Sequence, residues 1–392
     1  MVEKYTFKIA TERNLKKLLA SNDISQYNKD VLTEYSSDLT VLYGQKDATI
    51  CNKLQIMDLI FSTVHTDLNQ LTRKDIKRIL AAIENHEMPN GKKWNDQTKF
   101  NYKAKVKQFI AYLHQEEIIK EPLYDIIKLK MPSTIIQPQD ILTEDEVQMM
   151  IDCAANLRDK AMISLAFDIG ARIGEILTMQ LKHYIDSKHG GRVTITGKTG
   201  TRTIQLNYSI FYVRQWINAH PDRSNPEAYL WCNLKSKKNS GSYDVLNYHT
   251  TVNMFKAIGK KAGITKKTNP HRLRHAAVTR DTRHFSDGLL KKKFGWTPSS
   301  GMISNYSHIM CQDVNTEILR TMGIIETEKR QEINRCKNCG EINPYDFKWC
   351  GKCGNGLNDN IKKEMDSIIT DILFQLHKNP EIFAETLSRM KA

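Results

Sequence analysis

The chain has 392 residues, 40% of them hydrophobic and 26% charged, with only 19 glycines and 10 prolines; this favours two or three domains and excludes a fibrous or low-complexity architecture. Its net charge of +14 favours a polyanionic partner, with nucleic acid ahead of an anionic membrane surface. Because the N-terminus lacks an apolar signal segment and no run is apolar enough to span a bilayer, we expect a soluble, cytoplasmic protein without a membrane partner.

Residues 12–130 carry helical apolar patterns and predict a helical N-terminal domain. Its clearest helix has an apolar stripe formed by Tyr102, Val106, Phe109, Ile110 and Leu113. Basic residues gather on another face of this helix and in the turn before it: Lys92, Lys93, Lys99, Lys103 and Lys107. The pattern fits a DNA-contacting surface and, equally well, a solvated lysine face.

Residues 131–142 contain two prolines and show neither helical nor strand periodicity, which predicts an extended linker. A second domain, residues 143–325, then opens with a helix capped by Thr143 and Glu146. Alternating apolar residues on both sides of 197–201 predict a β-hairpin with Lys198 in its loop. Helical patterns fill the rest, so we expect a mainly α-helical domain with one small sheet.

Four segments of the second domain carry groups that phosphoryl transfer on nucleic acid requires. Arg172 and Arg274 can clamp the non-bridging oxygens of a phosphodiester with charge-assisted hydrogen bonds. His271 lies three residues before Arg274, on the same helical face, where it can exchange protons or hold a phosphate oxygen. The hydroxyl of Tyr306 can attack phosphorus and store the ester as a phosphotyrosine. Lys198 adds a cation at the hairpin loop. Each residue alone also fits an ordinary surface or capping role, so the prediction depends on the combination.

These residues stand in motifs that resemble the tyrosine recombinase, or phage integrase, family. Residues 171–175 match its A-R-x-G-E motif, residues 271–275 its H-x-L-R-H box, and residues 306–308 its Y-x-H ending. The resemblance covers the chain from Thr143 to about Leu319. Where the family most often has histidine in a Leu-Gly-His motif, this chain has Trp296, whose indole N–H can donate to a phosphate. The interval from there to the tyrosine is also about one residue longer than is usual in the family.

The resemblance implies a DNA breaking-rejoining fold and a site-specific recombinase or integrase that works through a 3′-phosphotyrosine, without ATP, another nucleotide or a catalytic metal. Within it, Tyr306 is the nucleophile, and Lys198 protonates the leaving 5′ oxygen. The implied catalytic residues are Arg172, Lys198, His271, Arg274, Trp296 and Tyr306, with Glu175 as the acidic support of the first arginine motif.

The same resemblance implies the partners. The N-terminal domain corresponds to a SAM-like core-binding domain, and the two domains together would clamp double-stranded DNA at a specific site. The protein would act as a homo-oligomer, a tetrameric synapse on DNA, and would associate with the nucleoid when bound there. A type IB topoisomerase, which shares the chemistry, and a catalytically silent zinc-ribbon regulator are the alternatives.

Four of the eight cysteines are scattered singly and are typical of small buried hydrophobic residues: Cys51, Cys153, Cys232 and Cys311. The other four form two C-x2-C pairs separated by ten residues: Cys336, Cys339, Cys350 and Cys353. This spacing predicts a structural Zn²⁺ site in a ribbon over residues 333–356. A redox pair is disfavoured because the two pairs match each other and no βαβ pattern surrounds them.

The C-terminal segment, residues 358–392, carries one further helical stripe. Its apolar residues are Ile361, Met365, Ile368, Ile372 and Leu376. Such a helix can pack on its own domain or on a neighbouring protomer, and the pattern alone does not choose between them.

Overall fold

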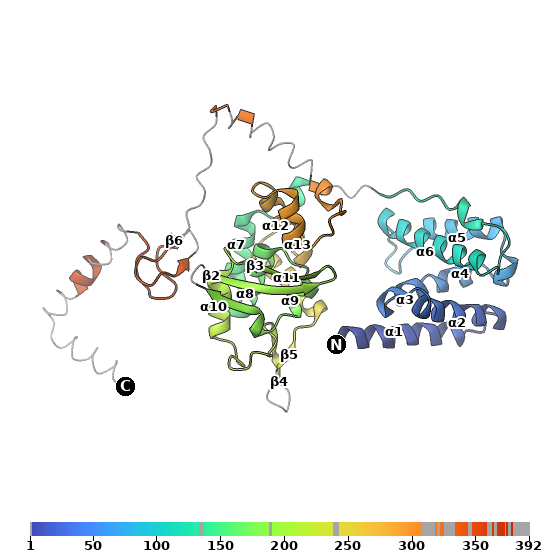
Figure 1. Ribbon diagram of the computed structural model, residues 1–392, viewed down its shortest axis with the longest axis horizontal. Helices are drawn as coiled ribbons and strands as arrows, with labels where there is room; N and C mark the ends of the chain where they lie inside the picture. The colour runs from blue at the N-terminus through green and yellow to red at the C-terminus, as the bar shows by residue number, and fades with distance from the viewer. Residues whose placement is uncertain are drawn as a thin grey trace. The chain divides into compact units, whose positions relative to one another are not determined.

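The computed structural model describes residues 2–132, 136–187, 190–237, 243–306, 318–319, 322–324, 334–343 and 347–358, together with 363, 367–372, 374 and 378 of the tail. The chain divides into two units, Met1–Thr134 and Ile135–Ala392 (Figure 1). The division falls inside the segment predicted as a linker. Within the described ranges, no helix is both long enough and apolar enough to cross a membrane.

Unit 1 is helical. Its elements are α1 (Val2–Leu19), α2 (Gln26–Val41), α3 (Asp47–Leu54), α4 (Met57–Thr63), α5 (Arg73–Asn85) and α6 (Asp96–Gln115), with 3₁₀ turns η1 (Leu68–Gln70) and η2 (Leu123–Ile126). The predicted stripe on α6 is confirmed, because Val106, Phe109, Ile110 and Leu113 are fully buried in the core of the unit. A capping box formed by Thr72 and Asp75 starts α5 and orients it against α6.

Among its described residues, unit 2 combines helices with three small antiparallel sheets (Figure 1). Its helices are α7 (Glu144–Cys153), α8 (Leu157–Ile169), α9 (Ile173–Leu177), α10 (Ile210–Asn218), α11 (Tyr248–Lys261), α12 (Pro270–Thr282) and α13 (Asp287–Phe294), with 3₁₀ turns η3 (Pro138–Asp140), η4 (Leu181–His183) and η5 (Met302–Tyr306). Helix α8 is buried along nearly its whole length and packs against α7, α10 and α12. It is therefore the central helix of this unit, as expected for a helix that is apolar on most faces.

The principal sheet consists of β1 (Tyr184–Ser187), β2 (Gly190–Gly197) and β3 (Gly200–Gln205) in that order. The predicted hairpin is confirmed: Val193 pairs with Ile204, and both point into the core. Its turn is tighter than the predicted loop, because the strands pair up to Gly197 and Gly200 and leave only two residues between them. The first strand was not predicted.

A second hairpin, β4 (Cys232–Lys237) and β5 (Tyr243–Val245), lies where the sequence predicted helices throughout. That expectation of a single sheet was wrong. The strand follows a short run of buried residues, Leu230 and Trp231, that is too brief to distinguish strand from helix by periodicity. A third pair, β6 (Asn334–Arg335) and β7 (Ile342–Asn343), belongs to the predicted ribbon.

The helix ends in unit 2 position the groups described below. The capping box of Thr143 and Glu146 is present at the start of α7. Gly170 ends α8 in the left-handed conformation, with φ +57°, and a Cβ there would lie 2.3 Å from a ring carbon of Phe294. Gly295 ends α13 in the same conformation, with φ +60°. The C-terminal ends of α8 and α13 therefore meet closely, and only glycine at residue 170 permits this approach.

Candidate active site and metal centre

Arg172 and Arg274 are both held by the turn that follows α13. Arg274, in α12, donates from Nη1 to the carbonyl of Gly170 at 2.6 Å and from Nη2 to the carbonyl of Phe294 at 2.8 Å. Arg172, at the start of α9, donates from Nη1 to the next carbonyl, that of Gly295, at 3.3 Å. Two consecutive carbonyl oxygens thus bring the two predicted phosphate-binding guanidiniums to the same turn.

Trp296, the residue in place of the family's histidine, covers the buried arginine. The Cζ of Arg274 lies 5.7 Å from the ring centroid of Trp296 and 5.5 Å from that of Phe294. Burial, together with the positive charge of Arg172, lowers the pKa of Arg274 to about 10. The guanidinium therefore still carries its charge at neutral pH, and the aromatic rings stabilise that charge.

Glu175 links the first arginine motif to the hairpin. Its Oε1 accepts from Nη1 of Arg172 at 3.1 Å, and its Oε2 accepts from Nη2 of Arg202 at 2.7 Å. Burial opposes ionisation of this carboxyl, but Arg202 and Arg172 outweigh it and hold the pKa of Glu175 below its usual range. A Cβ at Gly197 would lie 2.2 Å from Oε1 of Glu175, so the hairpin passes directly over the carboxylate.

Arg202, in β3, has a largely buried side chain, with 10% of its surface exposed, and was not among the predicted site residues. It also donates from Nε to the carbonyl of Lys293 at 2.8 Å, and this bond joins the hairpin to α13. One signal could have found it. Arg202 lies two residues before the inward-facing Ile204, and residues two apart in a strand point to the same face, so its side chain is expected on the buried face of β3. A charged residue on that face needs a partner.

Lys198 stands exposed at the hairpin turn. In the part of the chain that the structure describes, its ammonium has no hydrogen-bond or ion-pair partner. The neighbouring Thr199 donates from Oγ1 to the carbonyl of Gly295 at 3.2 Å, the same oxygen that Arg172 contacts. The turn bearing Lys198 is therefore fixed beside the two arginines.

Tyr306 ends η5 and is almost completely buried, with 1% of its surface exposed. Its hydroxyl lies 2.5 Å from Nδ1 of His275, the last residue of the H-x-L-R-H box. The predicted histidine, His271, is exposed and touches His275 edge to face, with ring centroids 4.4 Å apart. The structure thus brings the predicted tyrosine and histidine into one cluster, but the residue in contact with the hydroxyl is one that the sequence analysis did not select.

Of the five lysines predicted to contact DNA, the three on α6 have partners within unit 1. Lys99 and Lys103 both pair with Glu84 of α5, at 2.9 Å and 2.5 Å. The ammonium of Lys107 donates to the carbonyl of Ile127 at 3.2 Å. These side chains therefore connect α6 to α5 and to the segment after η2, a role that neither sequence interpretation had included.

The other two lysines, Lys92 and Lys93, are exposed in a turn that precedes α6. The turn is closed by a bridge between Glu87 and Lys93, and its glycine, Gly91, has φ +74°. These two lysines remain the accessible part of the predicted DNA-binding set. Their role is still a prediction.

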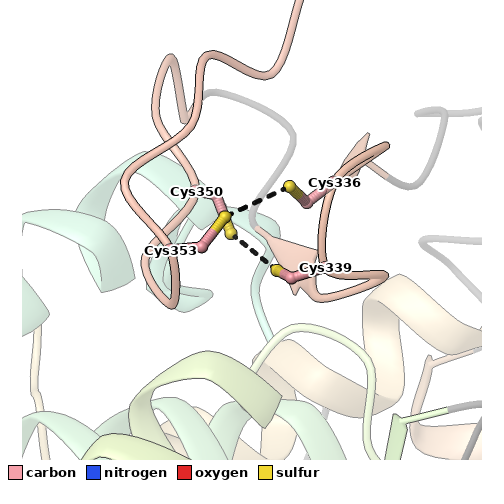
Figure 2. Close-up of side chains that lie close together, drawn as sticks. All are labelled: Cys336, Cys339, Cys350 and Cys353. Carbon is pink, nitrogen blue, oxygen red and sulfur yellow. Dashed lines mark hydrogen bonds between the residues drawn. The ribbon is translucent and has the colours of Figure 1, made fainter.

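The four clustered cysteines converge, as Figure 2 shows, with their sulfurs directed toward one another from two loops. The Sγ atoms of Cys336 and Cys353 are 3.6 Å apart, as are those of Cys339 and Cys350, and all four lie within 4.8 Å of one another. A tetrahedral zinc with Zn–S bonds of about 2.3 Å requires sulfurs about 3.8 Å apart. The arrangement fits such an ion.

The two loops of the cluster have the same backbone design. In the first, the N–H of Cys336 donates to the carbonyl of Glu341, and Gly340 donates back to Cys336. In the second, the N–H of Cys350 donates to the carbonyl of Asn355, and Gly354 donates back to Cys350. Both glycines have positive φ, +72° and +69°, so each loop turns its thiols inward in the same way.

The ribbon packs on α10 of the same unit. The ring of Phe347 lies edge to face on that of Phe211, with centroids 4.8 Å apart. Glu341, which is buried, forms an ion pair with Arg214. A Cβ at Gly351 would lie 1.7 Å from a ring carbon of Phe211, so the second loop of the ribbon rests directly on this helix.

Several predictions fall on residues outside the described ranges. They concern Ser307 and His308 of the Y-x-H ending, Cys311, and Ile361, Met365 and Leu376 of the tail stripe. Among the described residues, Cys51 and Cys232 are buried as predicted, and Cys153 is half-buried.

Known proteins resemble this chain in sequence and in fold. Residues 140–312 match the family model described as the phage integrase family. This match covers less than half of the chain. The chain is 26% identical over 219 residues to a tyrosine recombinase of Thermosipho africanus, covering 55% of this chain and 72% of that protein. It is 29% identical over 154 residues to the tyrosine recombinase XerA of Pyrococcus horikoshii, covering 39% of this chain and half of that protein. The likeness to these proteins supports a tyrosine-type site-specific recombinase.

A solved structure has a fold similar to that of this chain. A lambda integrase dimer bound to a COC' core site matches 70% of this chain and 75% of its own, with a TM-score of 0.54 and 18% identity. At this identity the likeness concerns the fold. It agrees with the predicted mainly helical architecture with small sheets.

Proposed function

We propose that the chain cleaves and rejoins double-stranded DNA at a specific site through a 3′-phosphotyrosine on Tyr306, without ATP or another nucleotide. The observation that carries the proposal is the anchoring of Arg172 and Arg274 on consecutive carbonyls of one turn, those of Gly295 and Phe294. Two charged guanidiniums at one point form a receptor for the oxygens of a phosphodiester. Tyr306 lies close to this receptor, because its hydroxyl contacts His275, the residue that follows Arg274 in α12.

The proposed reaction conserves the ester. The oxygen of Tyr306 attacks the scissile phosphorus, while Arg172 and Arg274 stabilise the charge that develops on the non-bridging oxygens. The bond to the 5′ oxygen breaks, and Lys198 supplies the proton that this oxygen takes up. Attack by a 5′ hydroxyl reverses the steps, rejoins the strand and frees the tyrosine. His271 and the indole N–H of Trp296 are further phosphate donors in this proposal.

Charge and the structural relative support the choice of partner. The net charge of +14 favours a polyanion, and the lambda integrase structure of the same fold is a dimer on a core site. We extend this to duplex DNA as substrate and to a homo-oligomer, a tetrameric synapse, as the working assembly. Because the matched relatives are named recombinases and the arginine–tyrosine set is complete, neither a topoisomerase nor a silent regulator is favoured.

We further propose that Cys336, Cys339, Cys350 and Cys353 hold a structural zinc. When bound, zinc would supply the cross-link that maintains two short loops which bury little apolar surface of their own. The positive charge for the proposed cleavage comes from arginine and lysine side chains of residues 172–274, so the zinc has a structural role and the reaction itself uses no metal.

A nicked suicide duplex tests the central proposal. The duplex carries the sequence flanking the gene, and cleavage products are resolved under denaturing conditions. The wild type should form a DNA-linked band, and Tyr306→Phe should bind the duplex without forming it. Tyr229→Phe, a change at a more exposed tyrosine, is the matched control and should behave as wild type. A covalent band that persists in Tyr306→Phe contradicts the assignment.

A further inference from the structure

We infer that His275 is the proton acceptor for Tyr306 in strand cleavage and the proton donor to it in rejoining; the inference rests on the proposed role of Tyr306 as nucleophile. A phenol is a weak nucleophile until its proton is removed. A group that removes it must lie within hydrogen-bond reach of the hydroxyl. His275 meets this condition in the structure.

The contact between the two residues is direct and buried. The Oη of Tyr306 and the Nδ1 of His275 are 2.5 Å apart. Tyr306 has 1% of its surface exposed, and His275 has 9%. Within the described part of the chain, the histidine is the one hydrogen-bond partner of this hydroxyl. A neutral imidazole has one acceptor nitrogen, and the inferred proton transfer uses the tautomer in which Nδ1 accepts from the hydroxyl and Nε2 carries the hydrogen.

The surroundings keep this imidazole neutral before DNA binds. The charged and titratable groups near the two rings are His271, Arg272 and Arg274 of α12, Arg172 before α9, and Asp140 of η3, which lies 3.9 Å from Arg272. Burial, followed by the charges of His271 and the arginines, lowers the pKa of His275 to about 4. Burial raises the pKa of Tyr306, with Arg274 acting in the opposite direction. In the free protein the proton therefore stays on the tyrosine.

Binding of the substrate changes this balance in favour of transfer. A phosphodiester held by Arg172 and Arg274 brings negative charge that offsets the cations around His275, and a nearby anion favours the protonated imidazole. The O–H proton then moves to Nδ1 as the bond from the tyrosine oxygen to phosphorus forms. The bond from phosphorus to the 5′ oxygen breaks, and that oxygen takes its proton from Lys198. Rejoining returns the His275 proton to the departing tyrosine oxygen.

The inference separates the roles of the two histidines of the box. His271 is exposed, and within the described residues it makes no hydrogen bond to Tyr306, so it is free to contact phosphate. His275 serves the nucleophile.

Single-turnover cleavage of the suicide duplex tests the role of His275. His275→Ala should slow cleavage by about 10²–10⁴-fold, the usual contribution of a positioned acid or base. His275→Gln should be equally slow, because an amide can hold the hydroxyl in place but cannot take its proton. His284→Ala, at an exposed histidine just beyond the same helix, is the matched control and should cleave at the wild-type rate.

Two chemical rescues distinguish a proton acceptor from a residue that only positions the tyrosine. A bridging sulfur in place of the 5′ oxygen leaves without a proton, so it should rescue Lys198→Ala but not His275→Ala. Fluorinated tyrosine at residue 306 is more acidic and should restore much of the His275→Ala rate. In the protein that keeps His275, fluorinated tyrosine should shift the acidic limb of the pH profile of the cleavage rate little, because that limb reports protonation of His275.

The outcomes separate this inference from the proposed function. A wild type that forms no covalent complex overturns both. A wild type that does form it, beside a His275→Ala variant of equal rate, overturns only the role of His275. A wild-type cleavage rate in His275→Gln would likewise refute proton transfer to this residue. So would a His275→Ala rate that the bridging sulfur alone restores.

Discussion

Glu175 and Arg202 form a buried ion pair, in which Nη2 of Arg202 lies 2.7 Å from Oε2 of Glu175. The second oxygen of the same carboxylate accepts from Arg172, so the pair supports a guanidinium of the candidate active site. The pair also ties the Lys198 hairpin to α9, while a further bond from Arg202 reaches α13. Loss of Arg202 should therefore affect both the stability of unit 2 and the orientation of the first arginine.

Arg202→Met should lower the free energy of unfolding by about 1–3 kcal/mol, because Oε2 of Glu175 loses its guanidinium partner and only Arg172 remains paired with this buried carboxylate. Urea unfolding followed by fluorescence measures this in a Trp94→Phe background, where every remaining tryptophan lies in unit 2. Lys182→Met removes the exposed pair with Glu227 in the same unit and should change the stability little, because water and salt screen an exposed ion pair. Equal effects of the two changes would contradict the importance of the buried pair.

Arg274→Gln should slow strand cleavage by about 10²–10³-fold, or about 2.7–4 kcal/mol, as expected for loss of one donor to a developing oxyanion. DNA affinity should change much less, because it is spread over many phosphates. Single-turnover cleavage and a filter-binding titration at one salt concentration separate the two quantities. A variant that loses affinity and keeps its single-turnover rate would place Arg274 in binding alone.

The carboxyl of Glu175 predicts a pH dependence of stability. Its pKa is held below the usual value, which is near 4.3 for glutamate, so the group stabilises the fold fully above that value. This contribution is lost as the pH falls from about 4.3 through the pKa of the folded state. The stability difference between wild type and Glu175→Gln should therefore shrink on acidification across that range. A difference independent of pH would mean that the carboxylate is not preferentially ionised in the fold.

Local patterns were sufficient for much of the fold. The capping box at Thr143, the end of α8 at Gly170 and the paired strands around Lys198 follow from signals within a few residues of sequence. The motifs likewise indicated both arginines and the tyrosine of the candidate site.

Contacts between distant segments explain what the sequence could not show. Arg202 meets a carbonyl that lies 91 residues away, and His275 meets a tyrosine 31 residues away, so neither role has a local signature. The lysines of α6 gave a basic stripe in sequence, but their pairing with Glu84 depends on how α5 packs against α6. Charge partners of this kind are set by tertiary packing.

Removal of one cysteine tests the proposed zinc site. Cys336→Ser should release one zinc per chain, measured by elemental analysis, because a four-thiolate site loses a ligand. Cys153→Ser, at a half-buried cysteine outside the cluster, is the matched control and should keep the metal. A purified wild type without bound zinc would contradict the proposed site.

Cys336→Ser should also destabilise α10, because the ribbon packs on this helix. Loss of the metal unfolds a loop pair that depends on it, and this would remove Phe347 from Phe211 and Glu341 from Arg214. Hydrogen exchange should then increase in α10 of Cys336→Ser and stay unchanged in unit 1. Cleavage of the suicide duplex should continue, since Tyr306 and the turn that follows α13 lie outside the ribbon.

Treatment with EDTA should also leave cleavage intact, because the proposed reaction takes its positive charge from arginine and lysine side chains. Cleavage that stops on chelation and returns with magnesium would show that a metal takes part in the reaction.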